Sequence, residues 1–158
     1  MMAEDATRFA SYLICSSAGR LWAIPVEHVV ETMRPLPLEP MGEMPPFVLG
    51  ISIVRGAAVP VVHLAVLADA ANAAPANRYV TLRLGAGRLA GLAVESVIGV
   101  RELAVAAAAE IPPLLRESQP DAVAAITRLD AQLLSVLQVS RLVPDAVWRG
   151  LEEMKARP

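Results

Sequence analysis

Short apolar segments separated by turn residues run along most of the chain, and their lengths are typical of β-strands. Within residues 79–84, apolar side chains at alternate positions are interrupted by Thr81 and Arg83, the pattern of a strand with one buried face. A Gly-Ala-Gly turn at residues 85–87 follows and predicts a hairpin, because glycine tolerates the positive φ that tight turns often require. The apolar segment at residues 12–15 predicts a further strand. We therefore expect an all-β protein.

An internal repeat divides the chain into two similar halves. The segment Ala18–Val30 aligns without gaps with Ala86–Ile98, and seven of the thirteen aligned pairs are identical. Each copy holds a glycine turn, a short apolar strand and a Val-Glu pair at a predicted bend before the next strand. We therefore expect two similar sheets, one in each half, with residues 12–77 forming the first and residues 78–143 forming the second.

Proline-rich segments mark places where central strands are excluded, because proline has no backbone N–H to donate to a sheet. They cover residues 35–46 and residues 111–113, and we expect extended loops at these matching places in the two halves. Between the halves, the small side chains of residues 68–77 predict a surface connection. A short helix that ends near Leu67 is expected to precede it.

The last part of the chain predicts one more hairpin and a helix. Residues 122–127 and 133–137 read as paired strands, which are expected to complete the second sheet. Apolar residues recur at helical spacing after Pro144, and proline suits the first turn of a helix. A C-terminal helix over residues 144–158, packed against the sheets, is the prediction.

Composition narrows the classes of function. The 158 residues, 55% of them hydrophobic, suffice for a single domain over 1–158, and the net charge of −2 with dispersed arginines predicts no binding of nucleic acid. Cys15 is the only cysteine, so an intramolecular disulfide is impossible, and a buried thiol in a reducing compartment is expected.

The acidic residues 1–7 lack a signal-peptide pattern, and no run reaches the roughly 20 apolar residues of a membrane span. We expect a cytoplasmic protein without direct membrane insertion.

Candidate catalytic chemistry is sparse. His28, His63 and Cys15 are too scattered to follow any metal-ligand or nucleophile spacing, so no metal site, catalytic residue or cofactor is predicted. The turn at residues 85–87 lacks the helix and lysine of a phosphate loop. A small barrel that binds a ligand or oligonucleotide is a remote alternative, because the few aromatic residues, such as Trp22, sit in apolar contexts rather than among basic residues.

One charge stands out within the apolar residues 47–64. Arg55 is the only fixed charge there, and the segment reads as two strands joined at an Arg55-Gly56 turn. Its guanidinium must either pair with a carboxylate or project from the turn as a recognition group.

Four motifs resemble, in order and spacing, those of the CheW family, the coupling proteins of bacterial chemotaxis arrays. They are Leu21–Val26 with Val29-Val30-Glu31, Val48–Gly56 with Val59–Val62, Gly91–Val97, and Ile111-Pro112-Pro113. The resemblance covers nearly the whole chain and implies two five-stranded SH3-like β-barrels packed together, with short connecting helices and no catalytic site. It also implies an adaptor that links the cytoplasmic tip of a chemoreceptor to the regulatory domain of a CheA-type histidine kinase.

The resemblance implies a receptor-binding surface that includes Arg55, Glu31, Gly50 and Val100, with a salt bridge between Arg55 and Glu31 beside it. It does not indicate which residues contact the kinase. A purely structural role, in which Arg55 closes a barrel corner, remains open.

Departures from the family pattern suggest a divergent member. His63 stands where an aspartate is usual, and a histidine caps the following helix less well. Glu95 replaces another aspartate, and Gln138 stands where an aspartate commonly follows the last strand. An alternative function is therefore a module that binds the kinase without a receptor, as an inhibitor or scaffold in pilus motility or another pathway.

Overall fold

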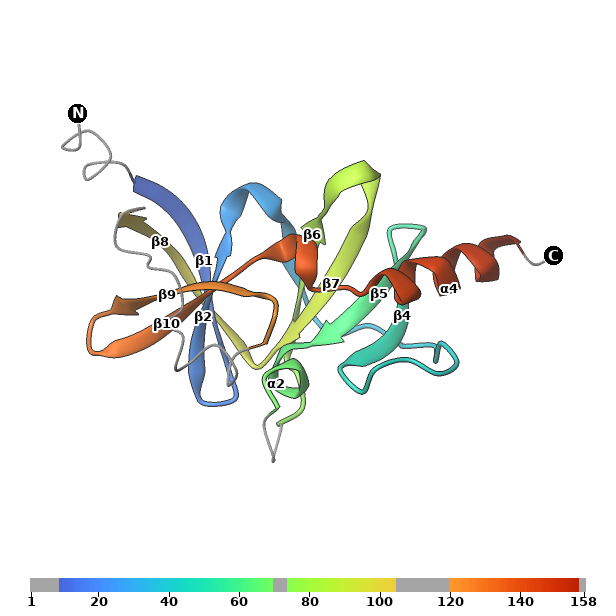
Figure 1. Ribbon diagram of the computed structural model, residues 1–158, viewed down its shortest axis with the longest axis horizontal. Helices are drawn as coiled ribbons and strands as arrows, with labels where there is room; N and C mark the ends of the chain where they lie inside the picture. Colours follow the sequence, from blue (N-terminus) through green and yellow to red (C-terminus); the bar gives the residue numbers. More distant parts are fainter. Residues whose placement is uncertain (1–8, 70–73, 105–119, 157–158) are drawn as a thin grey trace.

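The computed structural model describes residues 9–69, 74–104 and 120–156, which form two five-stranded sheets (Figure 1). The strands are β1 (Phe9–Ser17), β2 (Arg20–Pro25), β3 (Val29–Met33), β4 (Val48–Val54), β5 (Ala57–His63), β6 (Arg78–Arg83), β7 (Leu89–Val94), β8 (Ser96–Ala104), β9 (Val123–Leu129) and β10 (Gln132–Leu137). The helical elements are η1 (Val26–His28), α2 (Leu64–Leu67), η2 (Gly85–Gly87), η4 (Val139–Arg141) and α4 (Asp145–Ala156). The predicted all-β class with two five-stranded sheets is confirmed.

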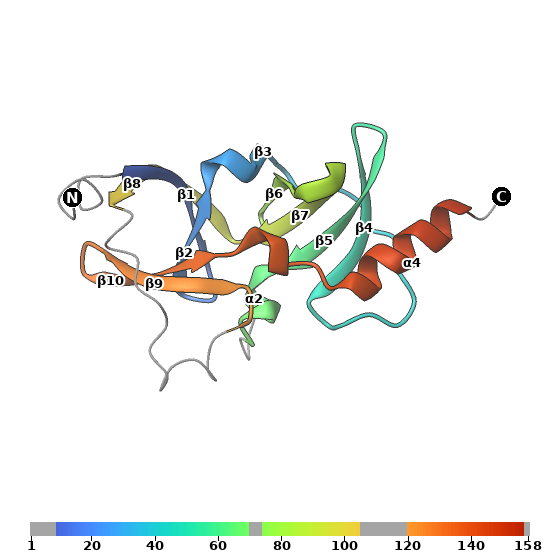
Figure 2. The ribbon, with the colours of Figure 1, turned by 45° about the horizontal axis from the view of Figure 1, so that its top comes forward.

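Each sheet takes strands from both halves of the chain. Sheet one has the order β8-β1-β2-β10-β9, and sheet two has the order β3-β6-β7-β5-β4 (Figure 2). The prediction that residues 12–77 and 78–143 form separate, consecutive barrels is therefore wrong. The predicted hairpin of residues 122–137 exists, but β10 pairs in parallel with β2, so it belongs to sheet one rather than to the sheet of the second repeat copy.

The chain passes from one sheet to the other at the two Val-Glu bends of the repeat. After η1, β3 leaves the β1–β2 hairpin and pairs with β6, and after Glu95, β8 leaves the β6–β7 hairpin and pairs with β1. The bends were predicted correctly. Because the two repeat copies offer similar apolar strands, the spacing of side chains does not distinguish pairing within a copy from pairing across copies.

The turns of the two repeat copies share an unusual backbone. Ala18 and Gly19 have φ values of 58° and 68°, and Ala86 and Gly87 have values of 62° and 72°. Positive φ at both central residues is typical of turns that match the twist of a hairpin. The sequence repeat is therefore a structural repeat as well.

The largest apolar cluster joins the two sheets. It includes Leu13 and Trp22 from sheet one together with Leu82 and Leu92 from sheet two. The Trp22 side chain is fully buried and its Nε1 donates a hydrogen bond to the Ser17 carbonyl at 3.0 Å. The apolar sequence context of Trp22 thus corresponds to a place in the core that the two sheets share.

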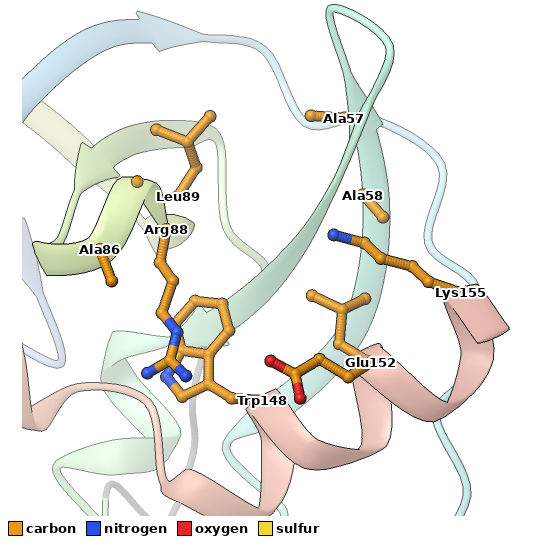
Figure 3. A pocket seen from close by; sticks show the side chains of 10 residues that line it. Ala57, Ala58, Ala86, Arg88, Leu89, Trp148, Glu152 and Lys155 are labelled. Atoms are coloured by element: carbon orange, nitrogen blue, oxygen red, sulfur yellow. The ribbon is translucent and has the colours of Figure 1, made fainter.

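Helix α4 packs beside β5 and the η2 turn of sheet two and confirms the predicted C-terminal helix. Val147, Trp148 and Leu151 are buried in the shared core, and the Arg88 guanidinium lies 4.9 Å from the centre of the Trp148 ring (Figure 3). This stacking contributes to the attachment of the helix to the η2 turn.

The short helix α2 begins at His63, which occupies the usual aspartate position. His63 Nδ1 accepts a hydrogen bond from the Val66 N–H at 3.4 Å, at the long end of the hydrogen-bond range. The histidine therefore caps the helix, though with a longer bond than a short carboxylate normally makes. The predicted loop at residues 111–113 and part of the linker after Leu67 lie outside the described residues.

Candidate binding surface at the Arg55–Glu31 ion pair

Arg55 occupies the turn between β4 and β5, where the sequence predicted it. Its φ is 50° and that of Gly56 is 83°, so both central residues of the two-residue turn have the left-handed conformation. The turn carries the Arg55 side chain away from the sheet, and 77% of that side chain is exposed to solvent.

The Arg55 guanidinium binds the Glu31 carboxylate in a bidentate arrangement. Nε donates to Oε2 at 2.7 Å, and Nη2 donates to Oε1 at 3.0 Å. Charge-assisted pairs of this planar geometry are the strongest and most directional that arginine makes. The predicted contact between the two residues is therefore present.

The pair joins the two edge strands of sheet two. Glu31 lies on β3 and Arg55 directly follows β4, and these strands stand at opposite ends of the hydrogen-bonded order β3-β6-β7-β5-β4. Contact between the two edges requires the sheet to curl on itself, as in a small barrel. The ion pair thus also contributes to closing this barrel.

The neighbouring strand positions the Glu31 backbone. Thr81 on β6 lies opposite Glu31, and its hydroxyl donates a hydrogen bond to the Glu31 carbonyl at 3.2 Å. Thr81 is only 2% exposed, whereas the alternating pattern of residues 79–84 predicted that it would face solvent. Because the sheet curls until its edges β3 and β4 come together, the Thr81 side of β6 is enclosed on the inner face of the curl.

The electrostatics of the pair favour its charged form. The hydrogen bonds from Arg55 lower the pKa of the Glu31 carboxyl, and this effect outweighs a smaller opposing effect of desolvation. The same hydrogen bonds raise the pKa of the Arg55 guanidinium. Both side chains therefore remain ionised at neutral pH.

Gly50, another predicted site residue, is buried within β4. Its φ is 142°, and a Cβ atom added there would overlap the backbone carbonyl of Glu39. Glu39 and Ile51 exchange two backbone hydrogen bonds of 2.8 Å each, which attach the loop before β4 to that strand. Gly50 thus permits a close approach between two backbone segments.

Val100, the fourth predicted site residue, lies on β8 in sheet one. It is opposite Leu13 of β1, and 53% of the residue is exposed. Ile98, two positions earlier on the same strand, is 48% exposed. The structure brings Arg55 and Glu31 into contact, whereas Val100 belongs to the other sheet.

Sequence reasoning missed two exposed apolar side chains that lie close to Glu31 and Arg55 along the chain. Val30 precedes Glu31 and is 40% exposed, while Ile53 on β4 is 62% exposed. A continuous apolar run such as residues 47–54 looks fully buried in the sequence. Period-two alternation does not identify Ile53 either, because Ile51, two positions earlier on β4, is only 4% exposed.

The described residues contain no group of three or more His, Cys, Asp or Glu side chains arranged to hold a metal ion. Cys15 is buried, and desolvation raises the pKa of its thiol to about 12. His28 contacts a residue 55 positions away in the chain, with its Nδ1 3.2 Å from the Arg83 carbonyl. In the part of the chain that the structure describes, no helix is both long enough and apolar enough to cross a bilayer.

Comparisons with known proteins agree with this architecture. The sequence profile of the CheW-like domain matches residues 11–147. Among solved structures, the scaffolding protein TtCheW from Thermoanaerobacter tengcongensis is similar, with a TM-score of 0.73 and 22% sequence identity over 83% of this chain and 90% of that chain. No curated protein matches the chain. The structural likeness concerns the fold and is consistent with two packed SH3-like barrels.

Proposed function

Because this chain belongs to the CheW-like domain family, whose members are scaffolding adaptors, we propose that it couples the cytoplasmic tip of a chemoreceptor to a CheA-type histidine kinase. The observation that carries the proposal is the exposed, bidentate Arg55–Glu31 pair. The proposed setting is cytoplasmic, at membrane-associated receptor arrays. No residue is assigned to kinase binding.

The chemistry of the pair suits a protein-binding surface. Of the five N–H donors of Arg55, two point to Glu31, and no other hydrogen bond of this side chain is found within the described residues. A receptor carboxylate or carbonyl can therefore bind the outer edge of the guanidinium while Glu31 holds it in place. The exposed Val30 and Ile53 supply apolar area of the kind that interface cores use.

Gly50 and Val100 take different parts in this proposal. Gly50 acts indirectly, because it lets the Glu39 backbone pack on β4 and so shapes the strand that leads into the Arg55 turn. Val100 offers an exposed apolar contact on β8. The receptor would then contact both sheets.

A charge swap distinguishes a role of Arg55 in binding the receptor from a role in closing the barrel. Arg55→Ala is expected to weaken binding of a receptor-tip fragment by about tenfold or more, as loss of a charge-assisted contact does, with little change in the thermal midpoint. The double variant Arg55→Glu with Glu31→Arg keeps an ion pair across the same two strands but reverses both charges. Binding should stay weak in the double variant if the receptor contacts the guanidinium at position 55.

Calorimetric titration with the receptor-tip fragment, next to a thermal melt of each variant, is the measurement. Full recovery of binding in the charge-swapped protein would show that the pair only closes the barrel.

Capture of native partners distinguishes the two adaptor roles. A histidine kinase together with a receptor supports coupling, whereas kinase without receptor supports the inhibitor or scaffold alternative, and a small molecule retained at stoichiometry contradicts both.

A further inference from the structure

A pocket lined by methionine and glutamate lies between the loop before β4 and helix α4. Its apolar wall includes Met41, Met44 and Met154, its rim carries Glu43 and Glu153, and its volume is about 390 Å³. We call it the methionine pocket. It is separate from the Arg55–Glu31 pair, which joins β3 to the β4–β5 turn.

A glycine in helix α4 makes the pocket possible. Gly150 lies inside a helix that runs from Asp145 to Ala156, where glycine is the least favourable residue after proline. A Cβ atom at position 150 would lie 2.9 Å from the Met44 Cε and 3.3 Å from the Met41 Cε. The missing side chain thus lets two methionine side chains approach the helix.

The charges at the rim have one sign. Glu43 and Glu153 are both exposed, and no Lys or Arg lines the pocket among the described residues. Met41 is 6% exposed at the floor and Met154 is 39% exposed. Methionine is flexible and polarizable, so a wall of this type accepts apolar side chains of several shapes.

From these charges and this lining, we propose that the methionine pocket docks a short basic peptide segment of a partner protein. One apolar side chain of the segment enters between the methionines, and flanking Lys or Arg side chains pair with Glu43 and Glu153. This inference does not depend on the coupling function proposed above.

The other side of α4 offers a matched control. Glu152 lines a second pocket of about 270 Å³, together with Arg88, Trp148 and Lys155 (Figure 3). The Glu152 carboxylate therefore shares this second pocket with two cationic side chains. Glu152 and Glu153 are adjacent in sequence and both exposed, yet only Glu153 lines the methionine pocket.

The probe is a fluorescein-labelled synthetic peptide in which one leucine is flanked on each side by lysines. Fluorescence anisotropy at physiological ionic strength, where charges outside the pocket are largely screened, should show saturable binding to the native protein. Glu153→Lys is expected to weaken it about tenfold, while Glu152→Lys changes it less than about twofold, because only the former reverses a charge at the pocket. Peptides with glycine in place of leucine, or glutamate in place of lysine, should bind at least about tenfold more weakly.

Gly150→Ala tests the pocket without a change of charge. Alanine favours the helix, so resistance to denaturant should be retained or increased, while the added methyl group displaces the Met44 side chain and weakens peptide binding several-fold. Full affinity in Gly150→Ala, equal losses in the two glutamate variants, or no saturable binding of the lysine-leucine peptide by the native protein would each overturn the proposal.

Discussion

The Arg55 guanidinium has two physical consequences for this molecule. It binds Glu31 through two hydrogen bonds and so joins the edges of sheet two, and it places an exposed planar cation on the surface. An exposed ion pair by itself contributes little to folding stability. A bidentate pair at a strand edge is therefore better explained by orientation of the guanidinium than by stability alone.

The pH dependence of this pair has a definite sign. The pKa of Glu31 is lowered in the folded protein from its ordinary value of 4.5, so the pair stabilises the folded state above that value. The contribution is lost as pH falls through the lowered pKa, because protonation removes the charge from the carboxylate. Denaturant unfolding of the native protein and of Glu31→Gln should therefore differ at neutral pH and converge in acid. A difference that persists unchanged in acid would mean that the pKa of Glu31 is not lowered.

The Cys15 thiol should resist modification while the protein is folded. Burial raises its pKa to about 12 from 9.0, so the reactive thiolate is scarce at pH values where a free cysteine ionises. A disulfide-exchange reagent is expected to react with Cys15 only after denaturation. The raised pKa also makes the contribution of Cys15 to native stability fall between pH 9.0 and about 12, since in this range the thiol ionises in the unfolded chain but not in the folded one. Cys15→Ala should reduce this alkaline loss, and a native thiol that reacts at the unfolded rate would contradict the burial.

At the scale of elements, strand β4 depends on a backbone contact that only glycine allows. Gly50 and Gly99 have similar φ values of 142° and 148°, but they differ in surroundings. A Cβ at position 50 meets the Glu39 backbone, whereas one at position 99 meets only the end of the Arg101 side chain at 3.5 Å.

The two glycines therefore form a matched pair of substitutions. Gly99→Ala should cost about 1 to 3 kcal/mol through backbone strain, and Gly50→Ala should cost roughly 2 kcal/mol more, because it also separates the loop from β4. Chemical denaturation measures both. If the two substitutions lowered the free energy of unfolding equally, the Glu39 contact would contribute nothing to stability. If Gly50→Ala also weakens receptor binding while Gly99→Ala does not, the shape of β4 matters for the proposed surface.

The elements themselves were largely predictable from the sequence, since local signals define them. Alternation, glycine turns and helical spacing identified the β6–β7 and β9–β10 hairpins and helix α4. The contact between Arg55 and Glu31 came from the resemblance, because nothing local links residues 24 positions apart. The exposure of Ile53 and the burial of Thr81 were missed, as both depend on which sheet edges meet.

At the scale of the whole molecule, the exchange of strands makes the two halves interdependent. The first half pairs β1 with β2 and β4 with β5, and the second half pairs β6 with β7 and β9 with β10. All other ladders, including β3 with β6 and β8 with β1, cross between halves. Isolated two-stranded hairpins are at best marginally stable in water, so neither half contains a sheet that can stand alone.

A cut between the halves tests this interdependence. A protease site inserted after the exposed Pro75 lies in the connection between β5 and β6, outside every strand and helix. The cleaved protein should elute as one particle from a sizing column, because the crossing ladders and the shared core hold the fragments together. Each fragment separated in denaturant and returned alone to buffer should lack a cooperative unfolding transition, whereas the mixture should recover it. Fragments that separate without denaturant and unfold cooperatively on their own would instead mean that each half is a complete barrel.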